Sequence, residues 1–232
     1  MPTLSYKERR GQIEAYFDRT AADAWKRLTS DAPVSGIRAT VRAGRDEMRA
    51  MLLSWLPADL TGRRLLDAGC GTGMLALEAA RRGAEVYAVD LSPTLIANAR
   101  ERVPEGLSGR IEYAVGDMLA PDQGTFDHVV AMDSIIHYEP DDALTVISGF
   151  TERARHSVLF TFAPRTPALS LMHAVGQWFP RTDRSPAIVP VAERGLCKAI
   201  AAEPTLDGWR IGQTRRIQRG FYTSQAMELN RK

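Results

Sequence analysis

A glycine-rich turn between a buried strand and a helix is the strongest chemical signal in the sequence. Residues 65–73 read Leu-Leu-Asp-Ala-Gly-Cys-Gly-Thr-Gly, so Gly69, Gly71 and Gly73 closely follow an acidic strand residue, Asp67. Glycines at this spacing allow positive φ angles and let a ligand lie against the backbone. The dinucleotide fingerprint GxGxxG would need its third glycine one position after Gly73, where the residue is Met. The turn therefore favours a ligand without phosphates, whose ammonium group Asp67 can bind.

Two further acids follow the next two strands that the sequence predicts. Asp90 can accept hydrogen bonds from both hydroxyls of a ribose. Asp117 can accept one from the amino group of an adenine while Met118 packs on the ring. Leu91 and Met132 are assigned to the same site. Each Asp taken alone could instead cap a helix, but the acids follow the glycine turn in order, at strand ends where open α/β sheets bind ligands. Together they indicate S-adenosylmethionine as the cofactor.

The segment after the fourth predicted strand, residues 133–138, bears on the group that is methylated. It lacks the Asp/Asn-Pro-Pro-aromatic motif typical of enzymes that methylate amino groups of nucleic acids, which argues against that chemistry. His137 stands at the mouth of the expected transfer site. It is either a donor or base that faces the acceptor, or a structural histidine that caps a helix or bonds a carbonyl.

Four arginines share one face of the second predicted helix. Arg38, Arg42, Arg45 and Arg49 follow one another at steps of 4, 3 and 4 residues, which is helical spacing. Such a stripe is either a solvated face or an arm over the active site that binds carboxylates, to which the forked guanidinium is suited. The first three are the candidate substrate-binding residues.

The elements that must position these residues alternate between strand and helix. Strand-like runs cover residues 63–68, 85–89, 111–115, 128–132 and 157–162, with two more at about 209–216 and 219–224. Helical patterns cover residues 5–30, 36–56, 74–82, 93–102 and 141–153. Alternation of this kind predicts an α/β fold with a mostly parallel, Rossmann-like sheet of the class I methyltransferase type. The C-terminal strand pair predicts the reversed strand of that sheet.

The predicted organisation has two parts. Residues 1–60 are expected to form an N-terminal helical arm, and residues 61–232 a methyltransferase domain with a lid inserted at about 164–190. The lid region holds five prolines and an apolar tract with Trp178 and Phe179. It reads either as a cap over a large flat acceptor or as a surface excursion with a short packed helix.

Composition bounds the class of protein. A net charge of +2, from 30 basic and 28 acidic residues, gives no general case for nucleic-acid binding. Cys70 and Cys197 cannot build a disulfide framework and stand in no metal-binding spacing. No signal-peptide pattern is present at the N-terminus, and no apolar stretch is long enough for a transmembrane segment. We therefore expect a cytoplasmic enzyme without a metal site, with peripheral membrane contact left open.

Several segments along the chain closely resemble the magnesium-protoporphyrin IX methyltransferase family, in the form of the bacteriochlorophyll pathway. The segments that carry the resemblance are Tyr16-Phe17, Val41-Arg42-Ala43-Gly44-Arg45, Asp67 to Gly73, Asp133 to Tyr138, Phe162 to Thr166 and Gly220 to Ser224. The glycine motif is common to all class I methyltransferases, whereas the arm, the Ile136-His137-Tyr138 segment and the late Phe-Tyr pair are more specific.

This resemblance implies methyl transfer from S-adenosylmethionine to a propionate carboxylate of magnesium-protoporphyrin IX. It also implies active roles for His137 and for a tyrosine of the arm, which corresponds to Tyr16, with Tyr6 nearby in the sequence. A sulfonium methyl is already activated and a carboxylate is already anionic at neutral pH, so catalysis should come mainly from alignment of the two. A functional contact with magnesium chelatase is a further implication of the family.

Two alternatives stay open at this stage. One is a methyltransferase with the same cofactor that acts on another small molecule. The other is a non-catalytic module that binds a tetrapyrrole, although a pure scaffold has no use for acids placed at Asp67, Asp90 and Asp117. A dinucleotide oxidoreductase is disfavoured by the missing third glycine.

Overall fold

The computed structural model describes residues 3–16, 18, 36–120, 123–165 and 187–232. Within them the strands are β1 (Arg64–Ala68), β2 (Glu85–Asp90), β3 (Arg110–Val115), β4 (Phe126–Ala131), β5 (Ala154–Phe162), β6 (Trp209–Arg219) and β7 (Tyr222–Arg231). The helices are α1 (Leu4–Tyr16), α3 (Gly36–Ser54), α4 (Met74–Arg81), α5 (Pro93–Arg100), α6 (Pro140–Arg153) and α8 (Glu193–Ala202), with a 3₁₀ turn η3 (Pro204–Leu206).

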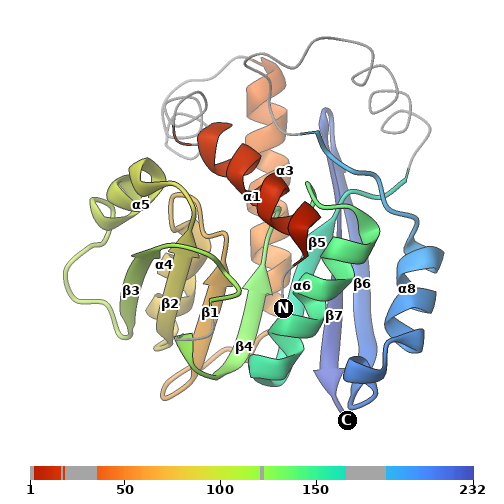
Figure 1. Ribbon diagram of the computed structural model, residues 1–232. Helices are drawn as coiled ribbons and strands as arrows, with labels where there is room; N and C mark the ends of the chain where they lie inside the picture. Colours follow the sequence, from red (N-terminus) through yellow and green to blue (C-terminus); the bar gives the residue numbers. More distant parts are fainter. Residues whose placement is uncertain (1–2, 17, 19–35, 121–122, 166–186) are drawn as a thin grey trace.

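All these strands form one seven-stranded sheet in the order β3-β2-β1-β4-β5-β7-β6 (Figure 1). Strands β1 to β5 pair in parallel, whereas β7 runs antiparallel to both of its neighbours, β5 and β6. The break in numbering between β1 and β4 is the point where the strand order reverses, and open sheets bind ligands there. The predicted α/β fold with a mostly parallel sheet and a reversed C-terminal strand is confirmed.

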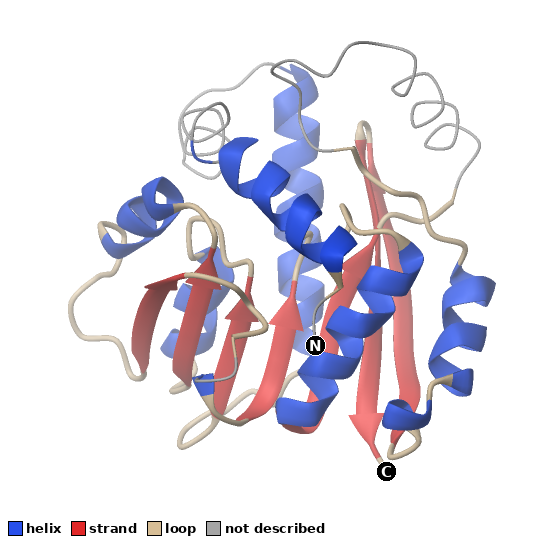
Figure 2. Cartoon of the chain, viewed as in Figure 1, coloured by secondary structure: helices blue, strands red, loops and turns tan. Residues whose placement is uncertain are grey.

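Helices cover both faces of the sheet (Figure 2). Side chains alternate along a strand, so neighbouring residues enter different cores. Leu66 and Val129 pack in the core beneath α1, α6 and α8. Leu65 and Val130, each one position away, pack in the core beneath α3, α4 and α5. These fully buried runs are what a sheet covered on both sides requires.

The C-terminal hairpin differs from the sequence-based prediction. A strand was expected over 219–224, but β6 continues to Arg219, and Gly220 turns the chain with a φ of 55°. Strand β7 then begins at Tyr222 and runs to Arg231. Its buried polar residues Gln225 and Glu228 concealed the strand pattern, because their side chains accept hydrogen bonds from β6 rather than facing water. Helix α8 was not predicted.

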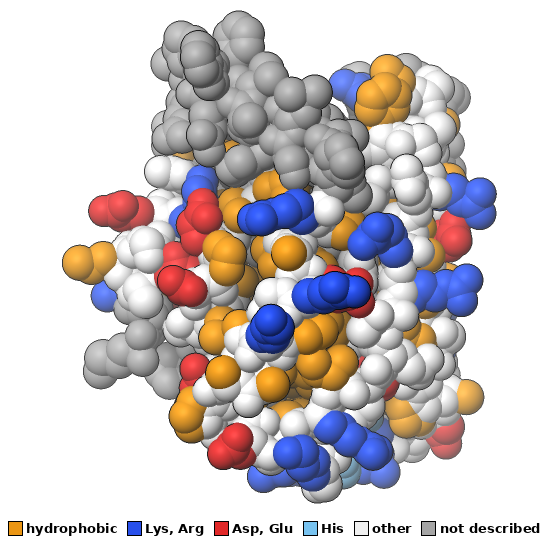
Figure 3. All heavy atoms as spheres, turned by 90° about the vertical axis from the view of Figure 1, so that its right-hand side faces the viewer, with side chains coloured by type: hydrophobic (Ala, Val, Ile, Leu, Met, Phe, Trp, Pro, Cys, Tyr) orange, Lys and Arg blue, Asp and Glu red, His pale blue; other side chains and the backbone are white. Residues whose placement is uncertain are grey.

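The sheet has a free edge at β6, and its surface argues against edge-to-edge pairing. Most of β6 is exposed, and its exposed residues include Arg210, Arg215 and Arg219. Charged side chains on an edge strand discourage the addition of a strand from another chain. Figure 3 looks onto this side of the molecule and shows Lys and Arg side chains spread among hydrophobic and acidic ones.

The predicted arm and lid are only partly within the described residues. Helix α1 accounts for the start of the expected helix over 5–30, and its continuation lies outside the described residues. Most of the expected lid, residues 166–186, also lies outside them. The two ends of that segment are joined, since Arg165 donates to Val191 at 2.9 Å and Val191 donates to Ala163 at 2.8 Å. Among the described residues, no helix is long and apolar enough to cross a membrane.

Candidate active site

A cavity of about 230 Å³ lies at the carboxyl ends of strands β1 to β4, beneath α1 and beside α3. Its wall contains residues from the glycine turn, from the ends of β2, β3 and β4, and from both N-terminal helices. The predicted site residues that line it are Arg42, Arg45, Asp67, Gly69, Gly71, Asp90, Leu91, Asp117, Met118, Met132 and His137. The fold thus brings most of the predicted residues to one place.

The turn after β1 is built around glycine. Gly69, Gly71 and Gly73 have φ angles of 75°, 56° and 75°, which residues with a side chain adopt only at a cost. A Cβ atom at position 69 would overlap the side chain of Ser134, and one at position 73 would overlap the hydroxyl of Tyr113. Glycine at 69 therefore lets the turn pass close to the loop after β4, and glycine at 73 lets it pass close to Tyr113 of β3. Gly73 does not line the cavity itself but begins α4.

The acids that end β1 and β2 are held by backbone amides. Asp67 is buried and accepts a hydrogen bond from the Ala76 amide of α4 at 3.1 Å. Burial, opposed by the Ala76 amide and supported by the nearby Asp90 carboxylate, raises the pKa of Asp67 to about 7. Asp90 accepts hydrogen bonds from the amides of Gly71 and Ser92 at 2.8 and 3.0 Å. Burial raises the pKa of Asp90 as well, although these hydrogen bonds act in the opposite direction and lower it.

The third predicted acid, Asp117, is bound to α1. Its carboxylate accepts a hydrogen bond from the Tyr6 hydroxyl at 2.6 Å and forms an ion pair with Arg10 at 2.7 Å. The Tyr6 ring also stacks on Tyr138, with 5.0 Å between ring centroids and 15° between the planes. Burial, followed by Tyr138, raises the pKa of the Tyr6 hydroxyl, so that hydroxyl stays a donor. Helix α1 is thereby fixed across the cofactor end of the cavity.

The candidate catalytic residues occupy different surroundings. His137 is buried in the cavity wall, with its Nδ1 3.3 Å from the carbonyl of Ala187. Tyr16 is half-buried at the end of α1 and does not line the cavity. Tyr6, three turns earlier in the same helix, is 1% exposed and does line it. The structure therefore brings His137 to the site together with Tyr6 rather than with Tyr16.

Some arginines of the α3 stripe also line the cavity and others do not. Arg42, Arg45 and Arg49 line the cavity, whereas Arg38 is exposed and does not. Arg45 forms an ion pair with Asp133 at 2.6 Å, and Arg49 forms one with Asp46 at 2.7 Å within its own helix. From Arg42 onward the stripe thus forms a wall of the cavity, as expected of an arm over the active site. At Arg38, near the N-terminal end of α3, it is a solvated face.

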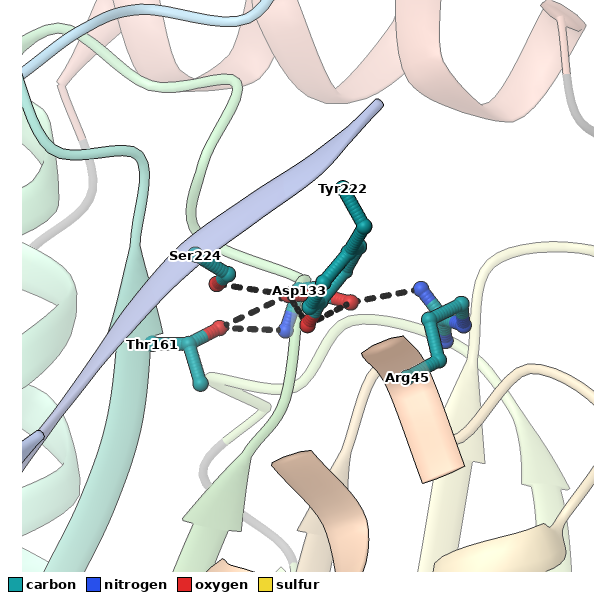
Figure 4. Close-up of polar contacts among 5 residues, drawn as sticks. All are labelled: Arg45, Asp133, Thr161, Tyr222 and Ser224. Carbon is teal, nitrogen blue, oxygen red and sulfur yellow. Dashed lines mark hydrogen bonds and ion pairs between the residues drawn. The ribbon is translucent and has the colours of Figure 1, made fainter. Parts of the chain in front are cut away.

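Among the residues of the cavity wall that were not predicted as site residues, Asp133 and Ser134 are adjacent in the chain. Asp133 follows β4 and accepts hydrogen bonds or ion pairs from Arg45, Thr161, Tyr222 and Ser224 (Figure 4). The Ser134 hydroxyl is enclosed and has no hydrogen-bond partner among the described residues. An enclosed hydroxyl without a partner is costly and marks a place where a ligand could bond. Asp133 stands two residues after the end of β4, and Asp90 is the last residue of β2, so a search for acids near strand ends would have found both.

The donor set of the cavity suits S-adenosylmethionine. Carboxylates stand at three strand ends, and the glycine turn is one that a Cβ would obstruct. Leu91, Met118 and Met132 supply apolar side chains. The turn itself contributes no basic residue that could bind a phosphate. Within the described ranges, no group of three or more His, Cys, Asp or Glu side chains is placed to hold a metal ion. Sheet order, glycine turn and strand-end acids together define a class I methyltransferase fold.

Comparisons with known proteins narrow this class to a family. Residues 131–231 match the profile of the magnesium-protoporphyrin IX methyltransferase C-terminus, and residues 65–156 match that of a methyltransferase domain. The chain is 47% identical to the magnesium-protoporphyrin O-methyltransferase of Rhodobacter capsulatus, over 98% of this chain and 99% of the relative. The chain belongs to the magnesium-protoporphyrin O-methyltransferase family.

More distant members agree over most of the chain. The chloroplastic magnesium protoporphyrin IX methyltransferase of Arabidopsis thaliana is 27% identical over 98% of this chain and 77% of its own length. A crystal structure of the magnesium protoporphyrin IX methyltransferase from Synechocystis, with bound SAH, superposes with a TM-score of 0.82 at 28% identity. It covers 96% of this chain and 99% of the Synechocystis chain. The predicted family resemblance is confirmed.

Proposed function

We propose that this enzyme transfers a methyl group from S-adenosylmethionine to a propionate carboxylate of magnesium-protoporphyrin IX. The product is the monomethyl ester, an intermediate of (bacterio)chlorophyll biosynthesis. The observation that carries the proposal is that one cavity joins two kinds of site. Strand-end acids suited to this cofactor stand at one end, and arginines of α3 suited to a carboxylate stand at the other. Membership of the family supplies the identity of the acceptor.

The cofactor end would hold S-adenosylmethionine through the three acids. Asp67 would accept from its ammonium group, Asp90 from its ribose hydroxyls and Asp117 from its adenine amino group, with Leu91, Met118 and Met132 against its apolar parts. Asp117 would serve in addition to its bonds with Tyr6 and Arg10, because a carboxylate has about four lone-pair sites. When bound, the cofactor supplies a methyl group already activated by a sulfonium centre.

The acceptor end has to hold an anion and keep water away. Arg42 and Arg45 would bind the propionate, because a guanidinium matches a carboxylate in charge and geometry. Arg38, which is exposed, could contact only a part of the acceptor outside the cavity. His137 would orient the reacting oxygen. No proton has to be removed from an ionised carboxylate, so alignment is the main demand on these residues.

The role of the arm tyrosine is open to a direct test. The hypothesis assigns Tyr16 and His137 to orientation of the propionate, while the cavity contains Tyr6. If His137→Ala and Tyr16→Phe both keep near-wild-type turnover, the assigned roles are wrong. A loss of turnover in Tyr6→Phe but not in Tyr16→Phe would transfer the role to the tyrosine in the cavity.

Domain organisation and setting complete the proposal. Residues 1–60 would act as the arm and 61–232 as the methyltransferase domain, with a lid at about 164–190. Because Met48, Leu52 and Leu53 of α3 pack in the domain core, the arm would be anchored at its C-terminal end. We place the enzyme in the cytoplasm, in line with its free cysteines, Cys70 and Cys197. Contact with magnesium chelatase and peripheral association with a membrane surface belong to the same proposal.

A parallel assay tests the reaction. Purified protein is incubated with labelled S-adenosylmethionine and either magnesium-protoporphyrin IX or metal-free protoporphyrin IX. Label in a porphyrin monomethyl ester, with the magnesium form preferred, is the expected result. Binding of S-adenosylhomocysteine without label in either porphyrin would leave the cofactor assignment intact and would rule out this acceptor.

A further inference from the structure

The carboxylate of Asp133 lies where helix α3 meets the ends of β4, β5 and β7. Its Oδ2 is 2.6 Å from Arg45 and 3.1 Å from the Tyr222 hydroxyl. Its Oδ1 accepts hydrogen bonds from Thr161 at 3.0 Å and Ser224 at 3.1 Å. The side chain is only 5% exposed, yet it lies in the cavity wall. Figure 4 shows the partners converging on it from separate elements.

The backbone at this residue is held in an unusual conformation. Asp133 has a φ of 53°, the only positive φ of a non-glycine residue among those described. A residue with a side chain persists in this region only when its surroundings hold it there. Thr161 does so twice, because its hydroxyl accepts from the Asp133 amide at 2.7 Å and donates to the Asp133 carboxylate. Such strain, where it occurs at a functional site, is associated with pre-organisation.

Charge excludes two direct roles for this carboxylate. The acceptor of the proposed reaction is itself a carboxylate, so Asp133 would repel it rather than bind it. An ionised acceptor also needs no base, so proton abstraction is not required of Asp133. The role that remains is to act on Arg45, which it contacts in the cavity wall and whose charge suits an anionic acceptor.

We propose that Asp133 is a positioning residue for the methyl transfer, which fixes the Arg45 guanidinium at the acceptor end of the cavity and is itself held by the Tyr222 hydroxyl. This inference rests on the proposed function. Gly44 supports the arrangement, because a Cβ at that position would overlap the ring of Tyr222. Helix α3 therefore packs directly on Tyr222 beside Arg45, and Asp133 contacts both side chains.

Kinetics of Asp133→Asn test the inference. Misplacement of the acceptor should lower kcat about 10- to 100-fold, with binding of S-adenosylhomocysteine unchanged within about twofold. The KM for magnesium-protoporphyrin IX should not rise, because the substitution removes a negative charge beside an anionic substrate. Arg45→Gln should also lower kcat. The double variant should lose much less than the product of the two single losses, because Asp133 acts through Arg45.

Asp127→Asn is the matched control. Asp127 is a buried carboxylate at the start of β4, the strand that Asp133 follows; it lies 3.6 Å from Arg63 and accepts a hydrogen bond from the Arg64 amide at 2.9 Å. It lies at the other end of β4 from the cavity, so its loss should lower the melting temperature while kcat and KM stay near wild type. Tyr222→Phe gives a second measurement if Asp133→Asn folds poorly. It removes only a hydroxyl and should lower kcat several-fold, with an unchanged melting temperature within a few degrees.

Two results would overturn the inference. One is a kcat within about twofold of wild type for both Asp133→Asn and Tyr222→Phe. The other is a loss in Asp133→Asn that appears equally in kcat, KM and S-adenosylhomocysteine binding and scales with the melting temperature as in Asp127→Asn. A wild-type enzyme that binds S-adenosylhomocysteine but does not methylate magnesium-protoporphyrin IX would instead contradict the proposed function, together with any role of Asp133 toward that acceptor.

Discussion

The two ends of the cavity are built in different ways. At the cofactor end, Asp67 and Asp90 are held by backbone amides of the turn or helix that follows their own strand or the neighbouring strand. At the acceptor end, Asp133 is held mainly by side chains from α3, β5 and β7, of which Tyr222 and Ser224 are 89 and 91 residues away in the chain. Backbone amides are present whatever the sequence, whereas side-chain partners have to be supplied one by one. The part of the cofactor end around Asp67 and Asp90 can therefore be shared across a fold class. Asp117, which side chains of α1 hold, and the acceptor end depend on particular partners.

Gly69→Ala should have the largest effect, because Gly69 is where the two ends touch. Its φ of 75° is unfavourable for alanine, and the added Cβ would overlap the side chain of Ser134. The turn and the loop after β4 must then move apart. We expect a loss of about 100-fold in affinity for S-adenosylhomocysteine, measured by calorimetry, which corresponds to about 2.7 kcal/mol.

Gly62→Ala separates backbone strain from this collision. Gly62 has a similar φ of 71°, but a Cβ there would meet nothing within 4 Å. Both variants should lose about 1–3 kcal/mol of stability from the left-handed conformation. Only Gly69→Ala should lose affinity. Equal affinities in the two variants would mean that the two ends of the cavity are not coupled through this contact.

Asp67 gives the cofactor end a pH dependence that the acceptor end should not share. Its pKa of about 7 in the free protein means that it is largely protonated below neutrality. An ammonium group of the ligand favours the ionised form. Affinity for S-adenosylhomocysteine should therefore fall about tenfold between pH 8 and pH 6, with release of a proton on binding near pH 7. Calorimetry in buffers of different ionisation enthalpy measures both quantities.

The same shift has a consequence for the free protein. A folded pKa above the unfolded value means that the folded state holds the proton more tightly, so this contribution to stability is lost as pH rises from about 4 through 7. Asp67→Asn should abolish that loss together with the pH dependence of binding, and should bind the ligand more weakly at pH 8. A wild-type affinity that stays constant from pH 6 to 8 would contradict the assignment of Asp67 to the ammonium.

The sequence predicts the cofactor end of the cavity better than the acceptor end. The order of the strands and the acids at their ends could be predicted because each depends on a local pattern, a buried run followed by a turn. The partners of Asp133 could not be predicted, because Arg45 and Tyr222 meet it only after the sheet has folded. The choice between Tyr6 and Tyr16 depends on packing for a related reason. Both lie on α1, and only the packing of that helix across the cavity decides which one faces inward.

Strand β7 and helix α8 show the same limit in the fold. Gln225 and Glu228 are buried, but their bonds to β6 are invisible in a pattern of apolar and polar residues. The turn at Gly220 was placed inside a predicted strand, although glycine was the available signal for a hairpin. Helix α8 buries only Leu196 and Ile200, so its apolar stripe was short.

His128 offers a titration outside both ends of the cavity, and the smallest expected effect. It lies in β4 near the amino end of the strand, with its Nδ1 2.8 Å from the Ser157 hydroxyl and its ring centroid 5.7 Å from that of His156. Burial lowers its pKa to about 4, with His156 and Arg63 adding to the shift and Asp127 opposing it. The histidine is thus neutral in the folded protein across the physiological range.

A lowered histidine pKa makes the folded state lose stability on acidification. Below about pH 6.5 the unfolded chain binds a proton at His128, whereas the folded protein does not bind it until about pH 4. Stability is therefore lost as pH falls between these values. The loss should be under about 1 kcal/mol at pH 6 and about 1–2 kcal/mol near pH 5. Urea unfolding at several pH values measures it.

In His128→Gln, which can still bond Ser157, the slope of stability against pH should be smaller. The kcat at pH 8 should equal that of wild type because the residue is remote from the cavity. An unchanged slope would assign the acid sensitivity to other groups, and a changed kcat would mean that the amino end of β4 influences the site at its carboxyl end.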